Sequence, residues 1–240
     1  MGAYELWLIW QNPRSRQRYH VGTLRHVEQG YQFAYEKHGP RTLPDALADG
    51  YRLHLVFPDT DKTYHARELF AAFSRRLPDR SRPDFLDILK RIGLSRDHTP
   101  MDLLSATGGR LATDTYEFVA PIILHDGCLN IDFIVAGWRY YEGESVKAYL
   151  RSNVTLLLEQ ESTNPFDHNA VLVLYNESIK LGYVPAYYSW AVAELLRAQN
   201  TVRVSVLQFD QTSDPDNPLK VSLSSVVKHT TDAFLMASSA

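Results

Sequence analysis

An arginine and a tyrosine stand next to each other in the segment AGWRYYEG, and both residue types can bind nucleic acid. The planar guanidinium of Arg139 presents a fork of N–H donors that suits a phosphate group. The ring of Tyr140 offers a flat face on which a nucleobase can stack. Alternation along an extended chain sends Tyr141 to the opposite face, so we assign Tyr141 to the core. A purely structural role does not account well for an arginine at position 139, and we therefore predict that Arg139 belongs to a binding site.

A second group of such residues lies in ESTNPFDHN, directly before an apolar run. Phe166 supplies another ring for stacking, and Asn164 carries both a donor and an acceptor for a base edge. Asp167, when ionised, accepts a hydrogen bond from a terminal 3'-hydroxyl group but repels a terminal phosphate. One stacked base contributes about 1–3 kcal/mol. A few residues of this kind could therefore hold the end of a single strand.

The same stretch also has the composition of a tight turn into a strand. Asn and Asp side chains bond to nearby backbone groups, and proline fixes its own φ. We therefore expect Asn169, and one of Asn164 or Asp167, to have a structural role. In the following LGYVP segment, Gly182 is expected to serve backbone geometry, whereas Tyr183 suits either packing or contact with a strand.

Patterns that mark an enzyme are missing from the sequence, which contains no GxxxxGK[ST], GxGxxG, GxSxG or HExxH. The single cysteine, Cys128, excludes an internal disulfide and a cysteine-rich zinc site. Glu159, Glu161 and Asp167 could hold a divalent metal, as in a nuclease, because alternation puts the two glutamates on one face. This nuclease is an alternative; our main expectation is a protein with no catalysis, no cofactor and no metal.

Composition and charge limit the size of the core and the kinds of ligand that the chain can attract. The chain has 240 residues, of which 45% are hydrophobic, so it can bury a sizeable core. Residues 1–124 hold 17 lysines and arginines and 15 acidic residues, whereas residues 125–240 hold 8 and 13, which gives the net charge of -3. This balance gives no general attraction to polyanions, so any binding of nucleic acid must be local.

The sequence gives no sign of membrane insertion or export. No apolar run approaches the roughly 20 residues that span a bilayer. The first residues, MGAYELWLIWQNPR, lack the basic-then-apolar order of a signal peptide. We therefore expect a soluble, cytoplasmic protein.

Hydrophobic periodicity predicts an α+β protein of two domains. In the first half, alternating segments predict a small antiparallel sheet, at residues 4–10, 18–27 and 30–37. Segments with helical spacing follow, at residues 66–77, 83–94 and 101–109. Residues 115–122 return to extended structure.

The second half contains mainly strand-like runs, at residues 131–137, 153–160, 169–175, 180–185, 201–209 and 219–227. One helical segment, residues 187–199, interrupts them. Many short strands with one helix predict a small β-barrel, closed or half-closed and of OB or SH3 type. We expect the domains at 1–124 and 125–230, with a tail at 231–240.

Three motifs in the second half occur in the order of one known family. AGWRYYEG (136–143), LEQESTNPFDHNAVLVL (158–174) and LGYVP (181–185) together resemble a HIRAN domain over about residues 129–228. The resemblance implies a small barrel of OB-like shape, which in the best-understood member of the family captures the 3'-hydroxyl end of single-stranded DNA. Within this region, the residues that we expect to bind nucleic acid are Arg139, Tyr140, Asn164, Phe166, Asp167, Lys180 and Tyr183.

The chain departs from the HIRAN pattern at two positions, one of them Phe166. Phe166 stands where the family often has tyrosine, so stacking remains possible but a phenolic hydrogen bond is lost. Ala186 follows GYVP near the place where many relatives carry a basic residue for phosphate. Lys180 or Arg151 could replace that basic residue.

The first half resembles the N-terminal subdomain of HipA-type toxin kinases over about residues 4–120, through VGTL, GYQFAYE and the helical stretch after them. In that family the subdomain contributes to partner contacts, and the kinase core is absent from these residues. We therefore expect an adaptor that binds single-stranded DNA and a protein partner. The main alternative is a purely protein-binding regulator, or antitoxin-like partner, of a HipA-type kinase.

Overall fold

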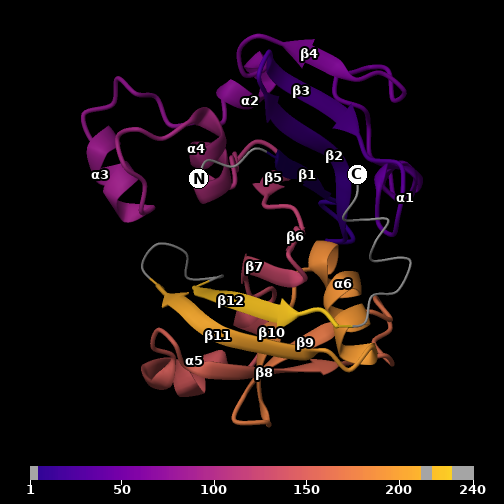
Figure 1. The fold of residues 1–240 in the computed structure, drawn as a ribbon, viewed down its shortest axis with the longest axis vertical. Helices are drawn as coiled ribbons and strands as arrows, with labels where there is room; N and C mark the ends of the chain where they lie inside the picture. Colours follow the sequence, from indigo (N-terminus) through magenta and orange to yellow (C-terminus); the bar gives the residue numbers. More distant parts are fainter. Residues whose placement is uncertain (1–4, 212–217, 229–240) are drawn as a thin grey trace. The chain divides into compact units, whose positions relative to one another are not determined.

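The computed structural model describes residues 5–211 and 218–228, and the chain divides into two units, Met1–Pro121 and Ile122–Ala240 (Figure 1). The structure is of the predicted α+β class. The predicted tail, residues 231–240, lies outside the described residues.

The first unit contains a five-stranded antiparallel sheet in the order β4-β3-β2-β1-β5. Its strands are β1 (Glu5–Gln11), β2 (Arg18–Val27), β3 (Gly30–Tyr35), β4 (Tyr64–Ala66) and β5 (Tyr116–Val119). Alternation of apolar and polar residues in β3 buries Tyr31, Phe33 and Tyr35 on one face, as the sequence pattern predicts. Phe33 then packs on Phe57 and Phe73 in the core.

Four short helices accompany this sheet: α1 (Leu43–Ala48), α2 (Ala71–Ser74), α3 (Phe85–Arg91) and α4 (Pro100–Thr107). The helix start after Thr99 has a clear local cause. The Thr99 side chain accepts a hydrogen bond from the backbone N–H of Asp102, whose carboxylate accepts one from the backbone N–H of Thr99. Gly108 ends the helix at φ 67°.

The second unit is a seven-stranded antiparallel sheet in the order β10-β9-β8-β11-β12-β7-β6. Its strands are β6 (Leu124–His125), β7 (Cys128–Ile134), β8 (Thr155–Gln160), β9 (Val171–Tyr175), β10 (Ile179–Tyr183), β11 (Thr201–Phe209) and β12 (Leu219–Val226). The long helix α6 (Ala186–Arg197) contacts β9 and β11. Short helical turns follow β7, namely η1 (Trp138–Tyr140), α5 (Gly143–Val146) and η2 (Lys147–Tyr149).

No fully closed barrel is found among the described strands, so of the two predicted forms, closed and half-closed, the closed one is wrong. The β8 strand changes partner along its length, because Thr155 and Leu156 pair with β11 whereas the rest pairs with β9. The two sides of the sheet meet at one isolated bridge, where Ala136 and Tyr183 exchange backbone hydrogen bonds of 2.8 and 2.9 Å. A single bridge joins the edges but does not make a continuous ladder of hydrogen bonds.

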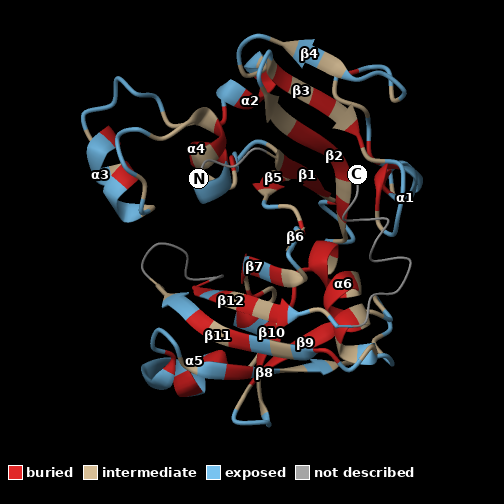
Figure 2. Cartoon of the chain, in the orientation of Figure 1, coloured by how far each residue is buried: buried red, intermediate tan, exposed pale blue. Residues whose placement is uncertain are grey.

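Burial follows the predicted pattern in both units (Figure 2). In the second unit, Leu129, Ile131 and Phe133 of β7 are buried, whereas the residues between them face outward. Trp138 and Tyr188 are the largest fully buried side chains of this unit. Among the residues that the structure describes, no helix combines the length and the apolar character needed to cross a membrane.

Candidate nucleic-acid interface

Arg139 and Tyr140 lie on η1 and project from the surface together. Gly137, at φ 82°, turns the chain out of the sheet, and the backbone N–H of Tyr140 donates to the Gly137 carbonyl at 2.9 Å. Trp138 is the buried anchor of this turn. The strand alternation assumed for this segment was therefore wrong, because a helical turn places successive side chains differently.

The two side chains of this turn are held against each other. The Arg139 guanidinium carbon lies 4.7 Å from the centroid of the Tyr140 ring, and a guanidinium N–H donates to the Tyr140 hydroxyl. Tyr140 is 69% exposed. The pair thus offers a cation and an aromatic face to solvent as one unit.

A hydrogen-bonded network lies around Tyr183 of β10. The Tyr183 hydroxyl donates to Glu161 Oε2 at 2.6 Å, and Asn164 Nδ2 donates to the same oxygen at 2.7 Å. Lys180 Nζ is 3.4 Å from Glu161 Oε1. Tyr141 contributes its ring, which meets that of Tyr183 at 5.6 Å in an edge-to-face arrangement.

This network favours an ionised carboxylate. The hydrogen bond from Tyr183, followed by that from Asn164, lowers the pKa of Glu161 below its usual value. Burial, followed by the hydrogen bond to Glu161, raises the pKa of Tyr183. The phenol therefore stays protonated and the carboxylate charged across the neutral pH range.

Asn164 and Asp167 both shape the loop that follows β8. Asn164 Oδ1 accepts hydrogen bonds from the backbone N–H groups of Phe166 and Asp167, at 3.0 and 3.2 Å. Asp167 Oδ1 accepts from the backbone N–H of Asn169, and its other oxygen accepts from the Ser189 hydroxyl on α6 at 2.9 Å. Both residues thus have structural hydrogen bonds.

Phe166 lies at the tip of that loop and is 76% exposed. Most large aromatic side chains of the protein are buried, so an exposed phenylalanine on an ordered turn is unusual. The turn that Asn164 organises presents this ring to solvent.

The structure therefore brings part of the predicted set together. Asn164, Lys180 and Tyr183 share one network, and Tyr141 links that network to the turn that carries Arg139 and Tyr140. The sequence did not assign Glu161 to this network, because its partners lie 3 to 22 residues away. In the sequence, only the position of Glu161 shortly before NPF could have indicated that it belongs to this network.

The three residues of the alternative metal site lie in different environments. Glu159 is an exposed residue of β8, Glu161 belongs to the Tyr183 network, and Asp167 bonds to the start of α6. Within residues 5–211 and 218–228, no group of three His, Cys, Asp or Glu side chains is arranged to hold a metal ion.

Fold and site together define an antiparallel β module that displays an ordered polar and aromatic surface, preceded by a separate α+β unit. Family models match both parts: the HipA N-terminal domain over residues 16–112 and the HIRAN domain over residues 126–228. The chain thus contains a HipA N-terminal domain followed by a HIRAN domain, as the motifs predicted.

Two solved structures are similar to part of the chain. One is a protein from Lactobacillus plantarum, with 27% identity, 41% of this chain and 97% of that chain covered, and a TM-score of 0.35. The other is the HIRAN domain of human HLTF, with 18% identity, 49% and 87% coverage, and a TM-score of 0.35. No curated protein matches the chain.

Proposed function

We propose that the protein is a cytoplasmic, non-catalytic adaptor whose HIRAN domain binds the 3' end of single-stranded DNA and whose HipA N-terminal domain contacts a protein. The observation that carries this proposal is the exposure of Tyr140 and Phe166 beside the ordered network of Tyr183. Exposed rings offer faces for bases, and an ordered network loses little entropy on binding. The end-binding role is the one that the HIRAN resemblance implies.

Each of these groups has a distinct role in the proposed complex. The fork of Arg139 binds a backbone phosphate, while Tyr140 and Phe166 stack on bases. Asp167 accepts a hydrogen bond from the terminal 3'-hydroxyl, because a carboxylate can accept more bonds than those that Ser189 and Asn169 donate. Lys180 adds positive charge, since Ala186 provides none. An OB-like curvature of the sheet would let these groups face one strand.

Fluorescence anisotropy with a labelled oligonucleotide that ends in a 3'-hydroxyl tests this proposal. Arg139→Ala and Tyr140→Ala should each weaken binding about tenfold, because each removes a phosphate contact or a stacked base. Arg139→Lys keeps the charge and loses the fork, so it should recover only part of the affinity.

Tyr149→Ala is the matched control for Tyr140→Ala. Tyr149 is also an exposed tyrosine of a short helical turn, at 62%, but it lies on η2 rather than beside the Tyr183 network. Its replacement should leave the affinity unchanged. Affinity that survives both Arg139→Ala and Tyr140→Ala would remove this site from consideration.

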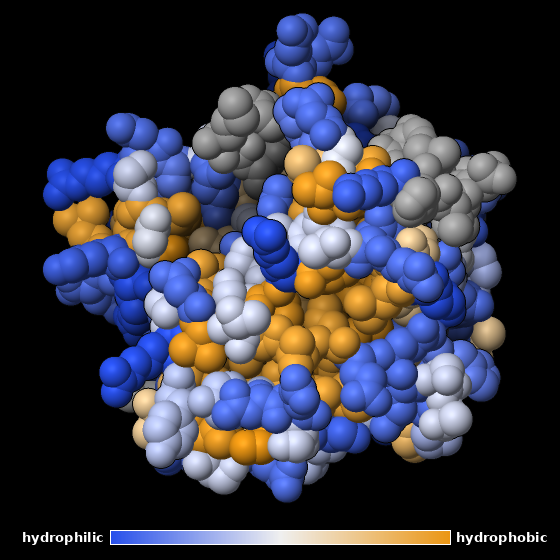
Figure 3. Space-filling model, turned by 60° about the horizontal axis from the view of Figure 1, so that its bottom comes forward, coloured by the Kyte–Doolittle hydropathy of each residue, from blue (hydrophilic) through white to orange (hydrophobic). Residues whose placement is uncertain are grey.

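A second candidate function is regulation of a separately encoded HipA-type kinase by protein contact alone. The HipA N-terminal domain and the acidic balance of residues 125–240 favour it. Leu55 and Val56 of the first unit are 94% and 53% exposed, which suits a protein interface. Figure 3 also shows apolar side chains gathered in the middle of the face that it draws, bordered by hydrophilic ones.

Co-purification distinguishes the two functions. Regulation is favoured if a HipA-type kinase co-purifies with the wild-type chain but not with Leu55→Asp, and if the chain has no measurable affinity for DNA. The absence of catalysis is tested separately by incubating end-labelled DNA with the protein and magnesium. Cleavage that Glu161→Gln abolishes would support the nuclease alternative.

A further inference from the structure

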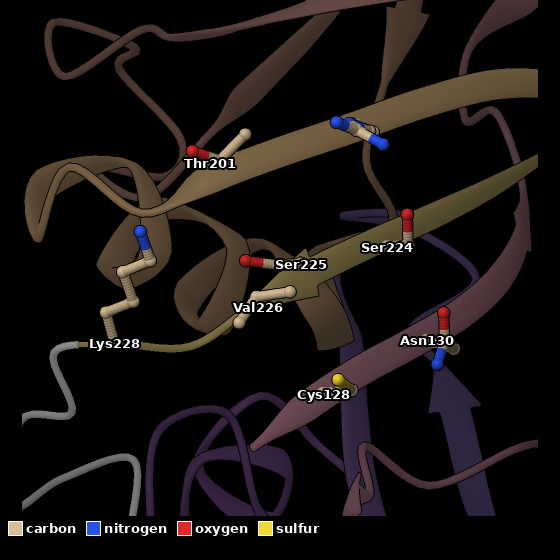
Figure 4. Close-up of a pocket in the computed structure, with 8 residues that line it drawn as sticks. Cys128, Asn130, Thr201, Ser224, Ser225, Val226 and Lys228 are labelled. Carbon is tan, nitrogen blue, oxygen red and sulfur yellow. The ribbon is translucent and has the colours of Figure 1, made fainter. Parts of the chain in front are cut away.

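A hollow of about 390 Å³ lies on the outer surface of three adjacent strands, β7, β11 and β12. Polar side chains of all three strands reach it, together with Lys228 just after β12 (Figure 4). None of the residues proposed to bind the DNA end lines this hollow. The hollow is therefore separate from that candidate site.

Strand register brings hydrogen-bond donors into a row across the hollow. Arg203 of β11 pairs with Ser224 of β12, which in turn pairs with Asn130 of β7. Residues opposite each other on one face of a sheet have Cβ atoms about 5 Å apart. A guanidinium, a hydroxyl and an amide thus stand next to one another and face the same side.

The neighbouring row is less polar. Thr201, Val226 and Cys128 pair in the same way across β11, β12 and β7. Val226 is 55% exposed, and Cys128 is partly exposed. This row gives the hollow an apolar side beside the row of donors.

The charge of the hollow is opposite to that of its surroundings. Residues 125–240 contain 8 basic and 13 acidic residues, yet Arg203 and Lys228 both line the hollow, and among the described residues no Asp or Glu does. In the part of the chain that the structure describes, neither cation forms an ion pair. Asp132, the next outward residue of β7, pairs with Ser222 beyond the row of donors.

We propose that this hollow binds a phosphate group of a nucleotide-sized ligand. Arg203 and Lys228 balance the charge of the phosphate, and Ser224 and Asn130 donate hydrogen bonds to its oxygens. The volume exceeds that of a phosphate alone, so an attached sugar can contact Val226 and Cys128. The phosphate can belong to a free nucleotide or to the backbone of a nucleic-acid strand.

NMR titration of the full chain in chloride buffer tests this site directly. The probes are inorganic phosphate, adenosine monophosphate and a circular single-stranded oligonucleotide, which has backbone phosphates but no end. Saturable shifts of the Thr201 and Ser224 amides with any of these probes would support the proposal. Saturation by the circular strand would identify backbone phosphate as the source, and saturation by the small probes alone would identify a free nucleotide.

Cys128 provides an independent readout, because it is the single cysteine of the chain and lines the hollow. A bound phosphate ligand should slow its alkylation by N-ethylmaleimide. In Arg203→Gln the same protection should require about tenfold more ligand.

Charge-matched variants make the test specific. Arg203→Gln and Lys228→Gln should each weaken binding of the probe about tenfold. Lys220→Gln removes an exposed cation of β12 that lies outside the hollow, and it should have no effect. The proposal is overturned if no probe saturates, or if Lys220→Gln weakens binding as much as the other two variants.

The outcome is independent of the proposed end-binding function. Arg139→Ala and Tyr140→Ala leave every residue of the hollow in place, so they should not change the titration with inorganic phosphate. Arg203→Gln should likewise leave discrimination between a 3'-hydroxyl and a 3'-phosphate end unchanged.

Discussion

Gly182 allows two segments of the HIRAN domain to approach each other at the base of the candidate site. A Cβ atom at this position would lie 2.4 Å from the Ala136 carbonyl oxygen and 2.7 Å from Val135 Cγ1. The backbone of Gly182 also has a φ of +146°, a conformation that residues with a side chain rarely adopt. The neighbouring Tyr183 forms the bridge to Ala136, so a side chain at Gly182 would push the edges of the sheet apart.

Gly182→Ala should therefore lower the free energy of unfolding by about 2–6 kcal/mol, the sum of overpacking and backbone strain. Chemical denaturation followed by tryptophan fluorescence measures the change. Gly127→Ala separates the two causes, because Gly127 also has positive φ but a Cβ atom there would meet only one atom, at 4.0 Å. An equal loss in both variants would mean that the close approach at Ala136 contributes nothing.

Residue types predicted the local role of a side chain better than they predicted its hydrogen-bond partners far away in the sequence. The turn-forming chemistry of Asn164 and Asp167 was visible in NPFDHN, and both side chains bond to backbone groups of the loop. The expectation left one of them open for binding, whereas both have structural bonds. The bond from Tyr183 to Glu161 spans 22 residues, and only the paired strands bring these side chains together.

At the scale of elements, alternation identified six strands of the second unit, and their observed bounds lie within a few residues of the predicted ones. Helical spacing was less reliable in the first unit. The helix predicted over 66–77 is reduced to α2, since Ala66 pairs with Tyr31 of β3 and Pro78 disfavours helical geometry at Leu77. Tertiary pairing thus overrode local periodicity.

The β1–β2 pair contains a histidine whose protonation should control stability. His20 stacks on Trp7 with ring centroids 4.5 Å apart, and its Nε2 lies 3.1 Å from the Gly22 carbonyl oxygen. Burial lowers the pKa of His20 to about 3, so the folded protein holds the neutral ring.

Unfolding returns His20 to a pKa of about 6.5. Below this pH the unfolded chain binds a proton that the folded chain does not, and the free energy of unfolding falls. The loss should reach about 2 kcal/mol at pH 5 relative to pH 7.5. Denaturation of the wild type and of His20→Gln at both pH values measures it. A pH dependence that is identical in the two proteins would contradict this role of His20.

At the scale of the whole molecule, the net charge of -3 implies that binding of nucleic acid depends on few contacts. A single phosphate held by Arg139 gives a log–log salt slope of about -0.7 on single strands. The affinity for a short strand should therefore change little between 50 and 200 mM salt, as anisotropy titrations can measure. A steep slope would indicate instead further phosphate contacts, for which the sequence offers Arg75, Arg80 and Arg82 of the first unit. Arg76, between them, is buried and paired with Asp114.

Motif order in the sequence was sufficient to predict both domains, and family models match the same two parts of the chain. The arrangement of the second sheet was harder to predict. Six strands were expected to form a barrel, but strand count does not determine closure, which depends on where β8 changes partner and on the single bridge at Ala136.

The central claim is that the HIRAN domain reads a free 3' end, and one comparison tests it most directly. Two oligonucleotides of the same sequence, one ending in a 3'-hydroxyl and one in a 3'-phosphate, are titrated with the protein under identical salt. We predict that the 3'-phosphate weakens binding about tenfold or more, because Asp167 repels the added charge and loses its donor. Equal affinity for the two ends would contradict the account.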